Sequence, residues 1–106
     1  MLRLLARAFV AAGLRVDEAI DGEEGLALAA SGDYALICVD DNLADMNGIE
    51  IMRALSARGY GGTLFFTSSS PDFARIGLAN GAHHAVMIPF DPADVTEKAH
   101  AFTGRG

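Results

Sequence analysis

Two continuous apolar runs most constrain the fold of this 106-residue chain. They span residues 34–39 (YALICV) and 63–67 (TLFFT), and each is too short to be a buried helix. A short run without polar alternation is typical of a strand that helices cover on both faces. The chain is therefore predicted to contain a sheet with buried central strands.

Segments with helical spacing of apolar residues alternate with these runs. We predict helices over residues 2–12, 23–30, 48–58, 73–80 and 91–102, and two further short strands over residues 15–20 and 85–88. Helices that alternate with strands are typical of a parallel sheet with right-handed crossovers and a helical layer on each face. The predicted fold class is α/β, with one domain over residues 1–106 and no output domain.

The charge balance narrows the classes of partner. Acidic residues number 14 against 8 basic ones, so the formal net charge is −6. Phosphate backbones and anionic lipids need a basic patch, so we expect neither nucleic acid nor a membrane as a partner. The apolar stretches are shorter than a membrane span, and we expect a cytoplasmic protein. The single cysteine, Cys38, excludes an internal disulfide and is predicted to be a small buried side chain.

Candidate functional residues follow the predicted strands. Ligands of open parallel sheets bind at the carboxyl ends of strands, where this chain places Asp40 and Thr67. A carboxylate in such a place can attack phosphorus, and a neighbouring hydroxyl can hydrogen-bond the transferred group. A plainer interpretation also stands, because strand-end aspartates often close turns, Ser/Thr clusters often cap helices, and Asn47 can cap the next helix.

The motifs together resemble the receiver domains of response regulators. The segment 40–48 (DDNLADMNG) is similar to their phosphorylation loop, and 21–25 (DGEEG) is similar to the opening of their second helix. Thr67 falls at the position of their switch hydroxyl, and the Gly-Ala step at 81–82 and the Pro-Phe step at 89–90 follow in register. The similarity covers nearly all of the chain.

This resemblance implies a flavodoxin-like doubly wound sheet and a role in a two-component phosphorelay, not enzymatic turnover. Asp40 would accept a phosphoryl group from a histidine kinase or phosphotransfer protein, and Thr67 would couple it to a downstream protein partner. A magnesium ion would be held by the backbone carbonyl of Asn42 and by Asp40, with a weaker expectation for Asp41.

Departures from the family pattern qualify these expectations. The sequence opens within the first helix of the pattern, so the first strand and its pair of acidic residues are absent, and we expect magnesium binding to be weak. Ile88 stands at the position of the family's lysine, and Ala85 stands where many members carry an aromatic ring. The only lysine, Lys98, is expected on a solvated helix surface.

The missing strand also predicts an open sheet edge. Open edges recruit other chains, so we expect a homodimer, a strand-exchanged oligomer or marginal stability. Two alternative functions remain at this stage. One is a pseudo-receiver that binds partners without phosphorylation, which Ile88 favours, and the other is a phosphatase with Asp40 as nucleophile, for which the sequence offers no second acidic loop.

Overall fold

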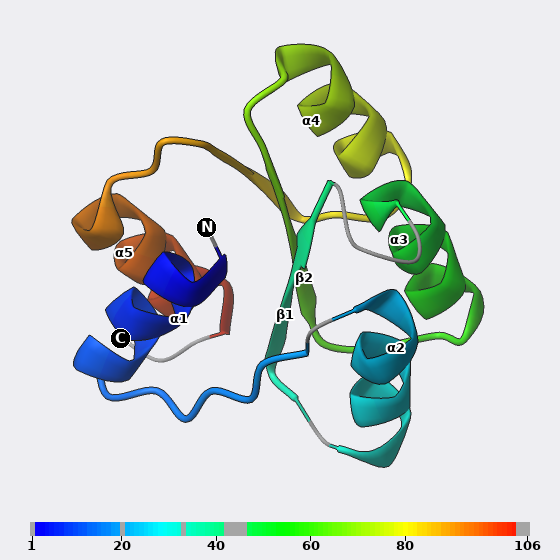
Figure 1. Ribbon diagram of the computed structural model, residues 1–106, viewed down its shortest axis with the longest axis horizontal. Coiled ribbons are helices and arrows are strands. Elements are labelled where there is room, and N and C mark those ends of the chain that lie inside the picture. The colour runs from blue at the N-terminus through cyan, green and yellow to red at the C-terminus, as the bar shows by residue number, and fades with distance from the viewer. Residues whose placement is uncertain (1, 20, 33, 42–46, 104–106) are drawn as a thin grey trace.

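The computed structural model of the protein describes residues 2–19, 21–32, 34–41 and 47–103 (Figure 1). Helices and strands alternate along most of this chain. The elements in order are α1 (Leu2–Ala11), α2 (Gly22–Ser31), β1 (Leu36–Asp40), α3 (Gly48–Ala57), β2 (Thr63–Ser68), α4 (Pro71–Ala79), β3 (His84–Met87) and α5 (Pro92–Thr103). Each of these elements was predicted from the sequence, with bounds that differ by one or two residues at most of the ends.

The three strands form one parallel sheet in the order β1-β2-β3. β2 is the middle strand, and its register places Thr67 beside Asp40 of β1 and beside Val86 of β3. Since all strands point the same way, their carboxyl ends share one edge of the sheet. The side chains of Asp40 and Thr67 are therefore brought to the same place by the pairing of their strands.

Helices cover both faces of the sheet, as the α/β prediction requires. Figure 1 shows α1 and α5 together on one side of the strands and α2, α3 and α4 on the other. Two adjacent residues of β2 anchor the two apolar cores, because successive strand side chains point to opposite faces. Phe65 packs into the core with α1 and α5, and Phe66 packs into the core with α3. Both rings are fully buried.

The strand predicted over residues 15–20 is wrong for the residues that the structure describes. Residues 14–19 form no regular element, and among the described residues β1 pairs with β2 alone. A strand needs a neighbour for its backbone hydrogen bonds, and a hollow separates this segment from β1. Ile20 itself lies outside the described residues.

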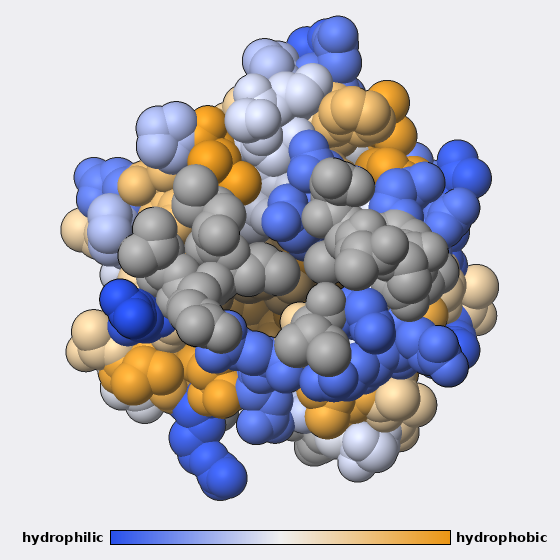
Figure 2. Space-filling view, viewed as in Figure 1, coloured by the Kyte–Doolittle hydropathy of each residue, from blue (hydrophilic) through white to orange (hydrophobic). Residues whose placement is uncertain are grey.

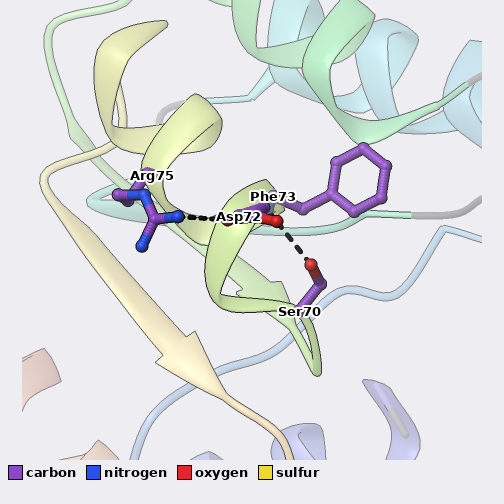
Figure 3. Close-up of polar contacts among 4 residues, drawn as sticks. All are labelled: Ser70, Asp72, Phe73 and Arg75. Atoms are coloured by element: carbon purple, nitrogen blue, oxygen red, sulfur yellow. Dashed lines mark hydrogen bonds and ion pairs between the residues drawn. The ribbon is translucent and has the colours of Figure 1, made fainter.

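Polar side chains cap the starts of four of the described helices, and before α5 the Asp91 carboxylate accepts from the backbone N–H of Ala93 at 3.0 Å. Asp21, Asn47 and Ser70 each accept a hydrogen bond from the backbone N–H three residues later, at 2.8, 2.9 and 3.3 Å. Such caps satisfy N–H groups that lack a partner in the first helical turn. Figure 3 shows the cap of α4, where Ser70 faces the backbone of Phe73 while Asp72 pairs with Arg75. The capping interpretation of Asn47 and of the serine cluster is thus confirmed.

Within the part of the chain that the structure describes, none of the helices has the length and apolar character needed to cross a bilayer. The longest of them, α5, has twelve residues.

Candidate functional site

The carboxyl ends of β1 and β2 bring a carboxylate and a hydroxyl together. The Oγ1 atom of Thr67 lies 3.5 Å from Oδ1 of Asp40 and 3.4 Å from the backbone oxygen of Val39, and the hydroxyl donates towards both. Thr67 is 2% exposed, whereas Asp40 is partly open to solvent. The prediction that the side chains of Asp40 and Thr67 lie close together is thus confirmed.

A second pair of side chains lies beside the first. The Ser68 hydroxyl donates a hydrogen bond to Oδ2 of Asp41 at 2.6 Å and accepts one from the backbone N–H of Ser70 at 3.0 Å. Ser68 is fully buried, and the backbone N–H of Asp41 donates to the carbonyl of Thr67 at 3.0 Å. Sequence reasoning did not find the role of Ser68. The strand register was the signal, because Asp40 opposite Thr67 places Asp41 next to Ser68.

Burial and a second carboxylate shape the electrostatics of Asp40. Partial removal from water is the main cause that raises the pKa of the Asp40 carboxyl above its usual value, and the hydrogen bond and negative charge of Asp41 raise it further. Two neighbouring carboxylates disfavour full ionisation of both. Without a compensating cation, the ionised form of Asp40 is therefore less favoured than that of an ordinary aspartate.

Gly48 fixes the start of α3 against this site. Its N–H donates to the carbonyl of Asp41 at 3.1 Å, and a Cβ atom built on it would collide with the carbonyl oxygen of Asp40 and crowd the ring of Phe66. Only a residue without a side chain allows this close approach of helix and strand. The glycine of the Asn47-Gly48 step therefore has a packing role next to the candidate nucleophile.

The residues expected to hold magnesium are only partly in view. Asn42 lies outside the described residues. Of the expected magnesium ligands, the structure therefore describes the carboxylates of Asp40 and Asp41. In the described ranges no cluster of three or more His, Cys, Asp or Glu side chains could hold a metal ion. Magnesium is commonly bound through one or two carboxylates together with water and phosphate oxygens, so this pair meets the minimum and no more.

Of the positions that depart from the family pattern, Ile88 lies next to the site, whereas Lys98 lies near the start of β3. The backbone N–H of Ile88 donates to the carbonyl of Ser68 at 3.0 Å, which places Ile88 next to the site through its main chain. Lys98 is exposed on α5 near His84, whose pKa is lowered first by burial and then by the Lys98 charge. His83 accepts a hydrogen bond at Nδ1 from the backbone N–H of Leu64 at 2.9 Å, which gives it a structural role.

Comparison with known proteins gives a consistent result. The sequence model of one family, the response regulator receiver domain, matches residues 1–100. The transcriptional regulatory protein CusR of Escherichia coli K12 is 35% identical over 104 residues. That match covers 96% of this chain but 46% of CusR, so the chain spans less than half the length of this relative.

Solved structures agree at the level of the fold. A CheY-like response regulator receiver domain from Methanospirillum hungatei superposes with a TM-score of 0.87 at 25% identity, over 97% of this chain and 84% of that one. The receiver domain of the sensor histidine kinase PA1611 from Pseudomonas aeruginosa has a TM-score of 0.87 at 19% identity, over 97% and 88% of the two chains. That protein was crystallised with a magnesium ion coordinated in its active site cleft.

Proposed function

Because this chain belongs to the family of response regulator receiver domains of two-component systems, we propose that it accepts a phosphoryl group on Asp40. The observation that carries the proposal is the position of Asp40 at the end of β1, with the hydroxyl of Thr67 3.5 Å from its carboxylate. Receiver domains are signalling modules, so the product of the reaction is the modified protein itself.

In the proposed phosphoryl transfer, the main contribution of the chain is to position the Asp40 carboxylate and the Thr67 hydroxyl. An ionised oxygen of Asp40 attacks the phosphorus of a phosphohistidine, a P–O bond forms, and the P–N bond breaks. The electron pair of that bond remains on the imidazole nitrogen, which takes up a proton and leaves. The Thr67 hydroxyl, which donates towards Asp40 before transfer, can then donate to an oxygen of the new phosphoryl group.

Asp41 and Ser68 support the site in this proposal. The buried Ser68 hydroxyl fixes Oδ2 of Asp41 and so holds this carboxylate next to Asp40. Asp40, Asp41 and the backbone carbonyl of Asn42 would hold a magnesium ion, which supplies neutralisation of charge during phosphoryl transfer. With two carboxylates in the donor set we expect this ion to bind weakly.

The partners follow from the same chemistry. A histidine kinase or a phosphotransfer protein supplies the phosphoryl group, and a downstream protein reads the phosphorylated surface. CusR, of which this chain spans 46%, is named a transcriptional regulatory protein. Ile88 at the lysine position offers no charge to a phosphoryl oxygen, so we expect slow phosphorylation.

Incubation with acetyl phosphate and magnesium tests the proposal. Intact-mass spectrometry should detect the gain of one phosphoryl group in the natural chain and no gain in Asp40→Asn. Asp91→Asn is the matched control, because Asp91 is exposed before α5 and asparagine can also accept the hydrogen bond from the backbone N–H of Ala93. This variant should be modified like the natural chain.

A chain that gains no phosphoryl group from acetyl phosphate or from a phosphorylated histidine kinase would overturn the proposal. Partner binding that persists unchanged in Asp40→Ala would then identify the pseudo-receiver function instead. Repeated turnover of a phosphoester, with release of phosphate in proportion to time, would identify a phosphatase.

A further inference from the structure

Two adjacent histidines lie at the amino end of β3, at the opposite end of the sheet from Asp40. Their rings form one aromatic cluster with two phenylalanines. The ring of His84 lies 5.0 Å from that of Phe65 and 5.9 Å from that of Phe102. The ring of His83 lies 6.5 Å from that of Phe102. Since Phe65 belongs to β2 and Phe102 to the last turn of α5, the cluster joins three elements.

The side chain of His83 serves as a hydrogen-bond acceptor of the sheet. The N–H of His83 donates to the carbonyl of Leu64 at 2.7 Å, and the N–H of Leu64 donates back to Nδ1 of the His83 ring at 2.9 Å. In a regular parallel ladder the second bond would go to a carbonyl of the neighbouring strand. Here the residues before β3 form a turn at Gly81, whose φ is +116°, and the imidazole takes the place of that carbonyl.

Only the neutral imidazole can accept this bond. An imidazolium carries a proton on both ring nitrogens and accepts at neither. Leu64 is 3% exposed, so its N–H would lose its acceptor within the sheet. His83 itself is exposed, and its charged ring can therefore turn out into water. Protonation of His83 thus breaks one of the two hydrogen bonds that it makes with Leu64.

The surroundings of His84 also disfavour a positive charge. Burial is the main cause that lowers the pKa of His84, and the charge of Lys98 on α5 lowers it further, whereas Asp94 on the same helix raises it. β2 has no charged residue, and the two of α4, Asp72 and Arg75, are exposed and pair with each other. The folded chain therefore binds this proton less tightly than the unfolded chain, so acid weakens the packing of His84.

The last turn of α5 is held on the sheet by the same cluster. The Thr63 hydroxyl donates to the carbonyl of Phe102 at 3.3 Å, and the ring of Phe102 meets that of Phe65 edge-on at 5.5 Å. Phe102 is nevertheless 42% exposed. Figure 2 shows hydrophilic residues interspersed among apolar ones over α1 and α5, at the left of the view, so water has access to the outer side of these helices.

We propose that His83 and His84 form an acid-sensitive latch, which holds the last turn of α5 on the amino ends of β2 and β3 and releases it as the pH falls from about 7 to about 5. Protonation of His83 removes the acceptor of Leu64. A positive charge on His84 adds to those of His83 and Lys98, and the ring loses its place against Phe65. The latch lies at the other end of the strands from Asp40, so the inference does not depend on phosphorylation.

Amide hydrogen exchange at Leu64 tests the first step. Its protection factor, which is corrected for the intrinsic effect of pH on exchange, should fall at least about fivefold between pH 7.5 and pH 5.0. In His83→Asn the side-chain oxygen can accept the same bond and cannot be protonated in this range. Leu64 should then keep its protection within about twofold at both pH values. In His83→Leu no acceptor remains, and the protection should be low at both.

A fluorescent reporter tests the release of α5. The chain has no tryptophan, so Phe102→Trp supplies a single emitter and keeps an aromatic ring in the cluster. Acrylamide quenching of this chain should rise at least about twofold from pH 7.5 to pH 5.0. The rise should disappear when His83→Asn and His84→Phe are added, because these residues keep the hydrogen bond and the ring without titrating. His100→Gln on the same turn is the matched control, and with it the rise should persist.

Three results would overturn the inference. One is a protection factor of Leu64 that does not change with pH in the natural chain. Another is an equal fall in His83→Asn, which would show that acid loosens the whole fold. The third is a quenching response that His100→Gln removes and the two changes at His83 and His84 do not. Thermal transitions at pH 7.5 establish which variants fold, and if His83→Leu does not, the contrast between the natural chain and His83→Asn still decides.

Discussion

Asp40 is the residue at which reactivity and stability oppose one another. Because its pKa is raised in the folded protein, the folded state binds a proton more tightly than the unfolded chain. Stability therefore falls as the pH rises through the interval above the ordinary pKa of an aspartate. At neutral pH the ionised carboxylate of Asp40 is a better nucleophile than the protonated acid. Its negative charge is also repelled by that of Asp41, which destabilises the folded state.

Replacing Asp40 by asparagine should therefore stabilise the protein at pH 7. We expect a gain of about 0.5 kcal/mol in the free energy of unfolding, kept small because solvent screens the partly open group. Urea unfolding at pH 7 and pH 4 measures it, and the gain should shrink at pH 4, where Asp40 of the natural chain is protonated to a greater extent than at pH 7. Glu97→Gln on the exposed face of α5 serves as control. Identical pH profiles for the natural chain and Asp40→Asn would contradict the expectation.

The Ser68 hydroxyl is predicted to contribute more to the stability of the fold than the other serine hydroxyls near the site. Ser68→Ala removes a donor to Asp41 and an acceptor for the N–H of Ser70, at a fully buried position. We expect a loss of about 1–3 kcal/mol, measured by urea unfolding. Ser69→Ala, at the exposed neighbouring position, should change the stability by less than about 0.5 kcal/mol. Equal effects of the two substitutions would refute a special role for Ser68.

Cys38, predicted from the sequence to be buried, is only half-buried in the structure, but its thiol should still be unreactive. Burial raises the pKa of its thiol to about 12, and the thiolate is the form that attacks disulfide reagents. At pH 8 the folded protein should react with such a reagent at least tenfold more slowly than the urea-unfolded chain, as followed by absorbance. Because Cys38 is the only cysteine of the chain, the signal has one source. Similar rates in both states would mean that this part of β1 is open to the reagent.

At the scale of elements, the junction of β1 and α3 leaves the least room for a side chain, because Gly48 packs against the backbone of Asp40. Gly48→Ala would drive a methyl group into the carbonyl of Asp40, so helix and strand must move apart. We expect a loss of about 1–3 kcal/mol in unfolding free energy, together with slower phosphorylation of Asp40. Gly61→Ala is the matched control, since an added Cβ there meets open space. A Gly48→Ala chain as stable as Gly61→Ala would show that the junction tolerates the change.

The elements that the sequence predicted well are those with a local signal. The runs 34–39 and 63–67 carry continuous apolar residues, and the starts of α2, α3 and α4 carry capping side chains. The segment 15–20 has strand-like residues, but strand formation depends on a neighbour that the local sequence does not specify. Its prediction failed because pairing is a property of the whole sheet.

The candidate site divides in the same way. Asp40 and Thr67 could be paired from sequence, because both end apolar runs of parallel strands and such ends meet at one edge. The bond between Ser68 and Asp41 depends on the register of β1 against β2, and the raised pKa of Asp40 depends on burial. Neither quantity is encoded in a short motif.

At the scale of the whole molecule, β2 joins the two helical layers through consecutive side chains. Phe65 and Phe66 fill opposite cores, and β1 and β3 both pair with this strand. A slip of β2 by one residue would exchange the faces of the two rings and empty both cores at once. The packing of both helical layers therefore depends on the register of β2. A change in that register would disrupt the cores on both sides of the sheet in a single step.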